Sequence, residues 1–239
     1  MIYTVTFNPA LDYVMKVEKL QFDDINRTYG EELNYGGKGI NVSVILSRLG
    51  VENTALGFQA GFTGEKLEEL LKADGIKTDF IALKNGMTRI NVKIKAQTEL
   101  DINAVGPPIE ADEVERLFEK IKAFQSGDVI VLAGSVPGTL PPDIYEKILS
   151  VTSKSGVESV VDATGDLLLN VLKYHPFLIK PNHFELGDLF GVKIRDEAEI
   201  EKYAKQLQEK GARNVLVSRG KEGATLITEH GGVHTIGII

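Results

Sequence analysis

Short runs of strand-forming apolar residues alternate with segments of helical periodicity along most of the chain. After Gly106 the pattern is regular and predicts helix 110–124, strand 128–133, helix 142–154, strand 158–162, a further helix, strand 177–180, helices 183–190 and 197–210, and strand 214–218. Nearer the N-terminus it predicts strands 2–7 and 54–58 and helices 39–49 and 64–73. Strands joined through helices form a parallel sheet that is covered on both faces. We therefore expect an α/β fold.

A second group of strand-like segments does not fit this sheet. These segments lie near residues 12–20, 30–36 and 88–105, and in the last of them Ile90, Val92 and Ile94 alternate with polar residues. Alternation of this kind is typical of a sheet with one face in water. The pattern predicts a small separate sheet that serves as a lid or as a dimer face.

Composition and charge limit the classes of function. The 239 residues are 43% hydrophobic and 26% charged, which is typical of a globular domain, and the formal net charge is -7. A nucleic-acid partner is disfavoured because it needs a broad basic surface, so a few local Lys and Arg residues would hold any anion. The chain has no cysteine, basic leader or membrane-spanning apolar run. We expect a cytoplasmic protein without a membrane partner.

Ligands of a parallel sheet bind at the carboxyl ends of its strands, so the residues after each strand are the candidate site. They are small, or they suit hydroxyls, phosphates and magnesium: Asn8, Asp12, Gly36, Gly37, Lys38, Asn41, Arg89, Gly134, Ser135, Asp162, Lys180, Asn182, Glu185, Ser218, Gly220 and Gly223. A dinucleotide site would need GxGxxG after the first strand, whereas that strand ends in FNPALD. GGKG is not a P-loop, and by itself it is more typical of a turn with a solvated lysine.

The segments TFNPALD, YGGKGINVS, TRINVK, VLAGSVP, VVDATG, KPNHFE and VSRGKEGA occur in this order between Met1 and about Ile239. The series resembles the PfkB, or ribokinase-like, carbohydrate kinases, and most closely the branch of 1-phosphofructokinase and tagatose-6-phosphate kinase. The resemblance implies one ribokinase-like domain over residues 1–239, a three-layer α/β sandwich with a mainly parallel central sheet. A small β-lid would also join two subunits in a homodimer.

The resemblance also implies ATP-dependent transfer to the 6-hydroxyl of fructose 1-phosphate, giving fructose 1,6-bisphosphate, with tagatose-6-phosphate kinase as the alternative. Within the sugar half, Asp12 and Asn41 would bond sugar hydroxyls, and Arg89 with Lys38 would hold the substrate phosphate. A planar guanidinium suits two phosphate oxygens. The remaining residues implied for the sugar half are Arg27, Gly36, Gly37 and Ser135.

In the nucleotide half, KPNHFE would bind ATP and magnesium. Asn182 and Glu185 would hold Mg²⁺ through its water shell, and the residues implied for ATP are Gly134, Lys180, Asn182, Ser218, Gly220 and Gly223. The spacing of Asn182 and Glu185 fits a helix N-cap with its capping-box partner equally well. Asp162 is expected to cap the helix that follows it.

The family's GAGD segment, which supplies the catalytic aspartate and an anion hole, would follow a hairpin corresponding to Ala224 to Ile238. The chain contains no such segment. We therefore assign no catalytic residue within it. The polypeptide of 239 residues alone is expected to be inactive, and the second hypothesis is a fragment that binds a sugar phosphate without transfer.

Overall fold

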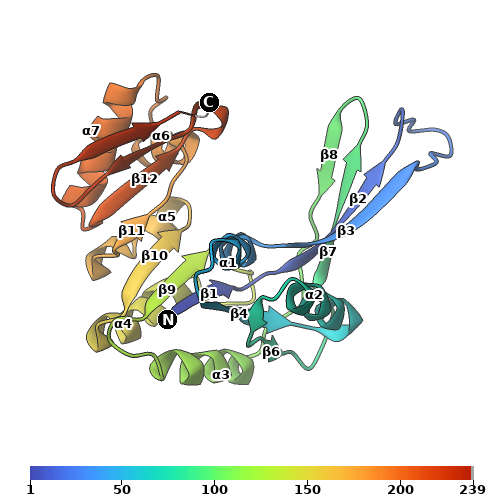
Figure 1. Cartoon of the computed structure of the whole chain (residues 1–239), viewed down its shortest axis with the longest axis horizontal. Helices are drawn as coiled ribbons and strands as arrows, with labels where there is room; N and C mark the ends of the chain where they lie inside the picture. The colour runs from blue at the N-terminus through green and yellow to red at the C-terminus, as the bar shows by residue number, and fades with distance from the viewer. Residues whose placement is uncertain (238–239) are drawn as a thin grey trace. The chain divides into compact units, whose positions relative to one another are not determined.

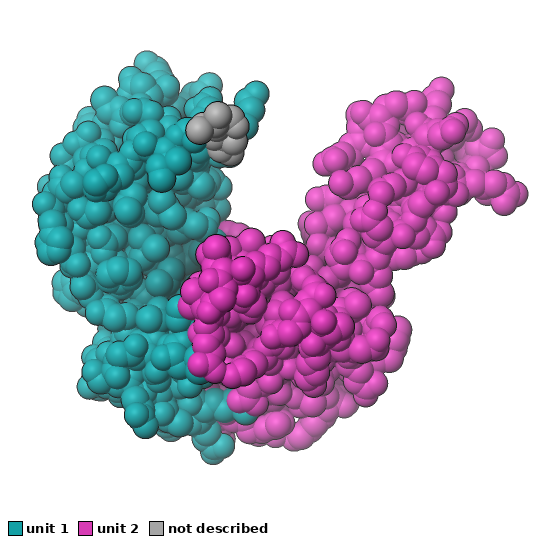
Figure 2. Space-filling model, in the orientation of Figure 1, with its two compact units in different colours: residues 1–3, 118–135, 141–239 teal, residues 4–117, 136–140 magenta. Residues whose placement is uncertain are grey.

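The computed structural model describes residues 1–237, which form two compact units (Figure 2). Unit 1 comprises Met1–Tyr3, Phe118–Ser135 and the chain from Pro141 onward, and unit 2 comprises Thr4–Leu117 and Val136–Leu140. Strand β1 (Ile2–Thr6) and helix α3 (Ala111–Lys122) each contain a boundary between the units. In this described part of the chain, no helix has both the length and the apolar character that crossing a bilayer requires.

Unit 1 is built on parallel strands in the order β9 (Val129–Ala133), β10 (Glu158–Asp162), β11 (Leu178–Ile179) and β12 (Asn214–Ser218). Strands β13 (Ala224–Ile227) and β14 (Val233–Ile236) continue the sheet in antiparallel pairs. The helices are α4 (Ile144–Thr152), α5 (Gly165–Leu169), α6 (His183–Phe190) and α7 (Glu197–Glu209). Ile130, Leu132 and Val215 are completely buried, as expected for strands with helices on both faces.

Unit 2 contains β1, β4 (Asn53–Gln59) and β5 (Lys77–Thr78), with the short β6 (Ile81–Ala82) also paired to β4. Helices α1 (Lys38–Arg48) and α2 (Gly61–Ala73) supply the other half of its core. Ile40, Leu67 and Leu71 are fully buried in one hydrophobic cluster. The cluster includes Leu11 from the next sheet, so the same core fixes the base of the lid.

The four-stranded lid sheet of unit 2 has the order β3 (Gly30–Gly36), β2 (Ala10–Lys16), β7 (Arg89–Lys95) and β8 (Glu99–Ile102) (Figure 1). Its pairs are antiparallel except β2 with β7. One face carries Leu11, Tyr35 and Ile90, which pack on the core of the unit. The other face is polar, because successive side chains of a strand point to opposite sides.

The predicted fold class is confirmed, and the differences are local. The sheet is mainly parallel, as expected, and the chain turns antiparallel after β12. The first lid strand ends at Lys16 rather than near residue 20. In the loop that follows, Asn26 exchanges hydrogen bonds with the backbone of Gln21, which competes with strand pairing. The expected hairpin corresponds to β13 and β14, and its last residue, Ile238, lies outside the described residues.

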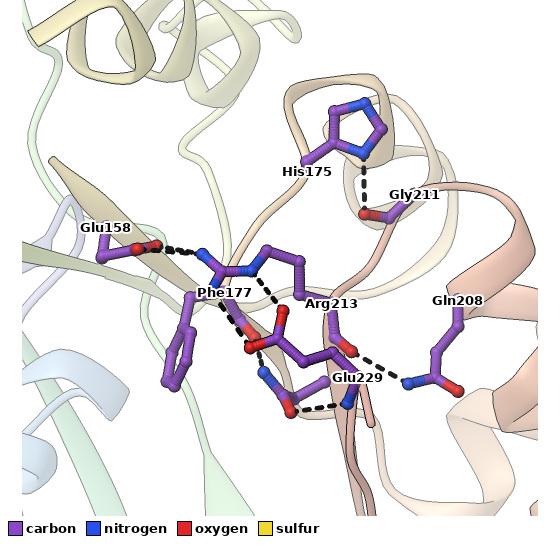
Figure 3. A network of polar contacts seen from close by, with 8 residues as sticks. Glu158, His175, Phe177, Gln208, Gly211, Arg213 and Glu229 are labelled. Carbon is purple, nitrogen blue, oxygen red and sulfur yellow. Dashed lines mark hydrogen bonds and ion pairs between the residues drawn. The ribbon is translucent and has the colours of Figure 1, made fainter. Parts of the chain in front are cut away.

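Arg213 joins three strands of unit 1 through charged contacts (Figure 3). Its Nη1 donates to both carboxylate oxygens of Glu158 at 2.8 Å, and its Nε donates to Glu229 at 2.7 Å. The guanidinium also lies 5.2 Å from the ring centre of Phe177. Its hydrogen bond lowers the pKa of Glu229 below the ordinary value of 4.5. Arg213 therefore links β10 to β12 and to the residues after β13.

Arg213→Met is expected to lower the melting temperature at pH 7, because both carboxylates lose their partner. A carboxylate with a lowered pKa stabilises the fold above its ordinary pKa, and this contribution is lost as pH falls through the folded value. The difference from the unmodified protein should therefore shrink below about pH 4.5. Thermal unfolding followed from pH 7 downward measures both effects, with Lys210→Met as the control. A difference that is independent of pH would contradict the assignment.

Candidate active site

Two glycines join lid strand β3 to helix α1 at a point where the neighbouring atoms leave no room for a side chain. A Cβ atom on Gly36 would lie 2.8 Å from Oδ1 of Asp12. Gly37 has φ 126°, which favours glycine, and its Cβ would lie 2.9 Å from the Thr6 methyl group. Gly37 is also the N-cap of α1 and supplies no side-chain cap, so no capping side chain satisfies the first N–H groups of the helix.

The carboxylate of Asp12 is held by two residues of β7. Asn91 donates from Nδ2 to Oδ1 at 2.9 Å, and the Lys93 ammonium lies 2.7 Å from Oδ2. The side chain of Asp12 is 14% exposed and that of Lys93 is 35% exposed. The hydrogen bond to Asp12 raises the pKa of Lys93 above its ordinary value. The Asp12 carboxylate is therefore a hydrogen-bond acceptor held in place on the polar face of the lid.

Arg89 lies at the base of the same face and is half-buried. It donates from Nε and Nη2 to the carbonyl oxygen of Asn8, at 3.2 and 3.0 Å, and from Nη1 to that of Ala104 at 3.2 Å. Burial lowers the pKa of its guanidinium, and the charge of Asp12 opposes this change. An arginine has five N–H donors, so with three used within residues 1–237 two remain for a ligand. Arg89 thus also fastens the loop after β1 to the segment after β8.

The structure brings most of the sugar-site candidates of unit 2 together, with one exception. Ala10 pairs with Gly36 on one side and with Arg89 on the other, and Lys38 and Asn41 follow in the first turn of α1. Arg27 is exposed in the loop beyond the opposite end of β2, which is about 20 Å long at ~3.3 Å per residue. Within one chain, Arg27 is therefore not part of the cluster.

In unit 1, Lys180 follows β11 and its ammonium lies 3.0 Å from Oδ2 of Asp162 at the end of β10. The expectation that Asp162 caps the next helix is wrong, because the N-cap of α5 is Thr164 and has no side-chain cap. Gly134 donates its N–H to the Asp162 carbonyl, which places the end of β9 in the same group. Ser135, the next residue, is exposed.

Asn182 and Glu185 form the capping box of α6. Oδ1 of Asn182 accepts from the N–H groups of Phe184 and Glu185 at 2.9 Å, and the Asn182 N–H donates to Oε2 of Glu185 at 2.8 Å. Asn182 also bridges to Ser218, whose N–H donates to the Pro181 carbonyl. The capping interpretation of this pair is therefore confirmed, and it leaves Oε1 of Glu185 without a hydrogen bond among residues 1–237.

The remaining nucleotide candidates, Gly220 and Gly223, border a short 3₁₀ turn after β12. Gly223 has φ 92°, and a Cβ there would lie 1.8 Å from the Ile236 carbonyl oxygen, so only glycine fits. Nowhere in residues 1–237 do three or more His, Asp or Glu side chains form a group that could hold a metal ion. A cation bound through water needs fewer protein ligands, and the free oxygen of Glu185 fits that role.

The sequence interpretation missed Lys93 and Asn91. Both belong to TRINVK, where they alternate with Ile90 and Val92, so the period of two placed them on the polar face of a lid strand. Nothing in the sequence specified the register of β7 against β2, which decides that these side chains reach Asp12. The signal that could have found them is that Asn91 and Lys93 share a strand face with the candidate Arg89.

The architecture is similar to that of two solved phosphofructokinases. Phosphofructokinase-2 from Escherichia coli in complex with fructose-6-phosphate superposes with a TM-score of 0.92 at 27% identity, covering 99% of this chain and 79% of that one. A putative phosphofructokinase from Staphylococcus aureus is 44% identical with a TM-score of 0.82, covering 96% and 74%. Fold and site together therefore define a sugar-kinase type of α/β protein.

The sequence pattern of the pfkB family carbohydrate kinases matches residues 5–239, and the chain belongs to this family. It is 44% identical over 228 residues to the 1-phosphofructokinase of Bacillus subtilis, covering 95% of this chain and 75% of that protein. It is 40% identical to the D-tagatose-1-phosphate kinase of Bacillus licheniformis, covering 94% and 74%. The chain thus spans about three quarters of the length of these relatives.

Asn182→Ala is expected to destabilise the protein by about 1 kcal/mol, because two N–H groups of α6 lose their acceptor. Glu185→Gln is the matched variant, since a glutamine carbonyl can still accept from the Asn182 N–H. Urea unfolding of both variants measures the difference. Equal stability of Asn182→Ala and the unmodified protein would contradict the importance of the cap.

Proposed function

We propose that the protein is an ATP-dependent kinase that phosphorylates the 6-hydroxyl of fructose 1-phosphate, giving fructose 1,6-bisphosphate. The observation that carries the proposal is the Asp12 carboxylate fixed on the polar lid face next to Gly36, in a member of the pfkB family. The choice of substrate is supported by the name of the 44% identical Bacillus subtilis relative.

In the sugar half of this proposal, Asp12 and Asn41 accept or donate hydrogen bonds to sugar hydroxyls. Arg89 binds the phosphate of the substrate through its two remaining N–H donors, assisted by the charge of Lys38 at the start of α1. The uncapped N-terminus of α1 adds its positive dipole end. Gly36 and Gly37 let the backbone approach the ligand, and Ser135 is the further residue assigned to the sugar.

In the nucleotide half, Lys180 contacts the phosphates of ATP, and Asn182, Ser218, Gly134, Gly220 and Gly223 line the nucleotide. The bridge between Asn182 and Ser218 supports their grouping. Glu185 orients waters of Mg²⁺ through the oxygen that the capping box does not use. Phosphoryl transfer depends mainly on alignment and charge neutralisation, and bound Mg²⁺ neutralises phosphate charge.

The proposal includes a homodimer formed through the lid, acting in the cytoplasm. The lid face opposite Asp12 bears exposed apolar side chains, with Leu33 and Leu100 at 39% and Ile102 at 55%. A group of this kind on an otherwise charged protein is typical of an interaction surface. Sedimentation equilibrium of the protein, compared with a Leu100→Lys variant, tests the dimer.

Tagatose phosphate is the second candidate substrate, favoured by the 40% identical D-tagatose-1-phosphate kinase. A coupled assay of ADP release, with magnesium and either fructose 1-phosphate or the tagatose phosphates, distinguishes the two. The assay uses a version of the chain extended through the family's GAGD segment, because the 239 residues alone are expected to be inactive. Turnover of fructose 1-phosphate at the highest kcat/KM is expected. Binding of a sugar phosphate without ADP release would instead support a non-catalytic binding protein.

Arg89→Ala is expected to weaken binding of fructose 1-phosphate by roughly 2 kcal/mol, because a charged contact to the phosphate is lost. ATP binding should be almost unchanged. Isothermal titration with each ligand measures both affinities, and melting temperatures check the fold. Arg116→Ala, an arginine of α3 that also contacts a backbone carbonyl, is the matched control. Unaltered sugar-phosphate affinity would remove Arg89 from the site.

Glu185→Gln is expected to raise the magnesium concentration needed for half-maximal turnover, because an amide orients the waters of the cation less well than a carboxylate. The affinity for the sugar phosphate should not change. Since the glutamine keeps the helix cap, a change in magnesium dependence separates the cation role from the capping role. Normal activity at limiting magnesium would contradict the proposed role of Glu185.

A further inference from the structure

Lys93 forms its ion pair with a diagonal neighbour and not with the residues directly opposite it. In the pairing of β7 with β8, Lys93 stands directly opposite Asp101, and in the pairing of β2 with β7 it stands opposite Val14. Its ammonium nevertheless lies 2.7 Å from Oδ2 of Asp12, which is one step diagonally along β2. The lysine therefore reaches back toward the base of the lid, where the proposed sugar site lies.

The two contacts from β7 leave some hydrogen-bond acceptor positions of the Asp12 carboxylate unused. An ionised carboxylate has about four lone-pair positions, two on each oxygen. Asn91 occupies one position on Oδ1, and Lys93 occupies one on Oδ2. Within residues 1–237 one position on each oxygen remains, which matches two hydroxyl donors on neighbouring carbons of a ketose ring.

The surroundings of Asp12 restrict its rotation further. Both carboxylate oxygens lie 2.8 and 2.9 Å from the Cβ position that Gly36 leaves empty, so the carboxylate rests against the β3 backbone. The amide of Asn91 is itself fixed, because its Oδ1 accepts from the Ala104 N–H at 3.3 Å. Among the described residues, Lys93 is the partner of Asp12 that has a flexible side chain and a full charge. A single ion pair of which one member is 35% exposed contributes little to stability, so loss of Lys93 should leave the fold intact.

We propose that Lys93 is a positioning residue, which orients the Asp12 carboxylate so that its two oxygens accept from two neighbouring hydroxyls of the sugar phosphate. The inference rests on the proposed function, since it assigns Asp12 to the sugar. Lys93 acts through Asp12 and is not among the residues proposed to bind the nucleotide. Its removal should therefore change sugar affinity and leave nucleotide affinity unchanged.

Lys93→Met is the primary variant, because methionine keeps much of the length and apolar stem of lysine and removes the charge. Lys95→Met is the matched control: Lys95 lies on the same strand and the same face, and its ammonium is 4.0 Å from Glu99. Lys93→Arg is the rescue variant, since a guanidinium can also pair with Asp12. Asp12→Asn and the double variant Asp12→Asn with Lys93→Met complete a double-mutant cycle.

Isothermal titration of the full-length protein with fructose 1-phosphate and, separately, with ADP is the measurement. Lys93→Met is expected to weaken sugar-phosphate binding by about tenfold or more, since a displaced positioning group carries a cost of this order. Lys93→Arg should recover most of the affinity, and Lys95→Met should bind normally. In the Asp12→Asn background, Lys93→Met should have almost no further effect. ADP affinity and melting temperature should remain as in the unmodified protein.

Normal fructose 1-phosphate binding by Lys93→Met would overturn this inference and leave the proposed function intact. Additive losses in the double-mutant cycle would also overturn it, because they would mean that Lys93 acts independently of Asp12. Failure of the unmodified protein to bind fructose 1-phosphate or a tagatose phosphate would overturn the proposed function itself, and the inference with it. If the cycle is instead strongly non-additive and the arginine rescues binding, Lys93 is assigned as proposed.

Discussion

The close contact between Asp12 and the backbone of Gly36 is the constraint on which the proposed sugar site depends. It brings β2 and β3 together at the point where β3 turns into α1, and the absence of a Cβ atom leaves the space that the carboxylate occupies. The adjoining Gly37 is the N-cap of α1 and supplies no side-chain cap, so the helix begins within two residues of that contact. An acceptor and a set of donors thus lie next to each other, as a ligand with both hydroxyls and phosphate requires.

The two sheets place their candidate site residues at different positions along the strands. The parallel strands of unit 1 are buried on both faces, so their side chains build a core and only the residues after each strand are left for chemistry. The lid has one polar face, and its functional residues lie in the middle of strands, where the register of β7 against β2 determines which side chains meet. This is why Asp12 has its partners at Asn91 and Lys93, whereas Lys180 finds Asp162 at a strand end.

Prediction from the sequence succeeded where the signal is local. The helical spacing after Gly37 located α1 to within a residue, and the period of two in TRINVK located the start of β7 but not its end at Lys95. The spacing of Asn182 and Glu185 allowed a capping box, and the structure contains one. The prediction that Asp162 caps a helix was wrong because the local sequence does not reveal its partner. An aspartate three residues before a glycine looks the same in sequence whether it caps a helix or pairs with a distant lysine.

By itself, the sequence determined the α/β class, the order of its elements and which residue types follow each strand, because hydrophobic periodicity and glycine placement are properties of short segments. Only the tertiary structure decided which of those residues act together. It separated Arg27 from Arg89, committed three N–H groups of Arg89 to carbonyl oxygens of Asn8 and Ala104, and brought Lys93 to Asp12. These are contacts between residues far apart in the chain, and their partners are chosen by strand register and by packing on a shared core.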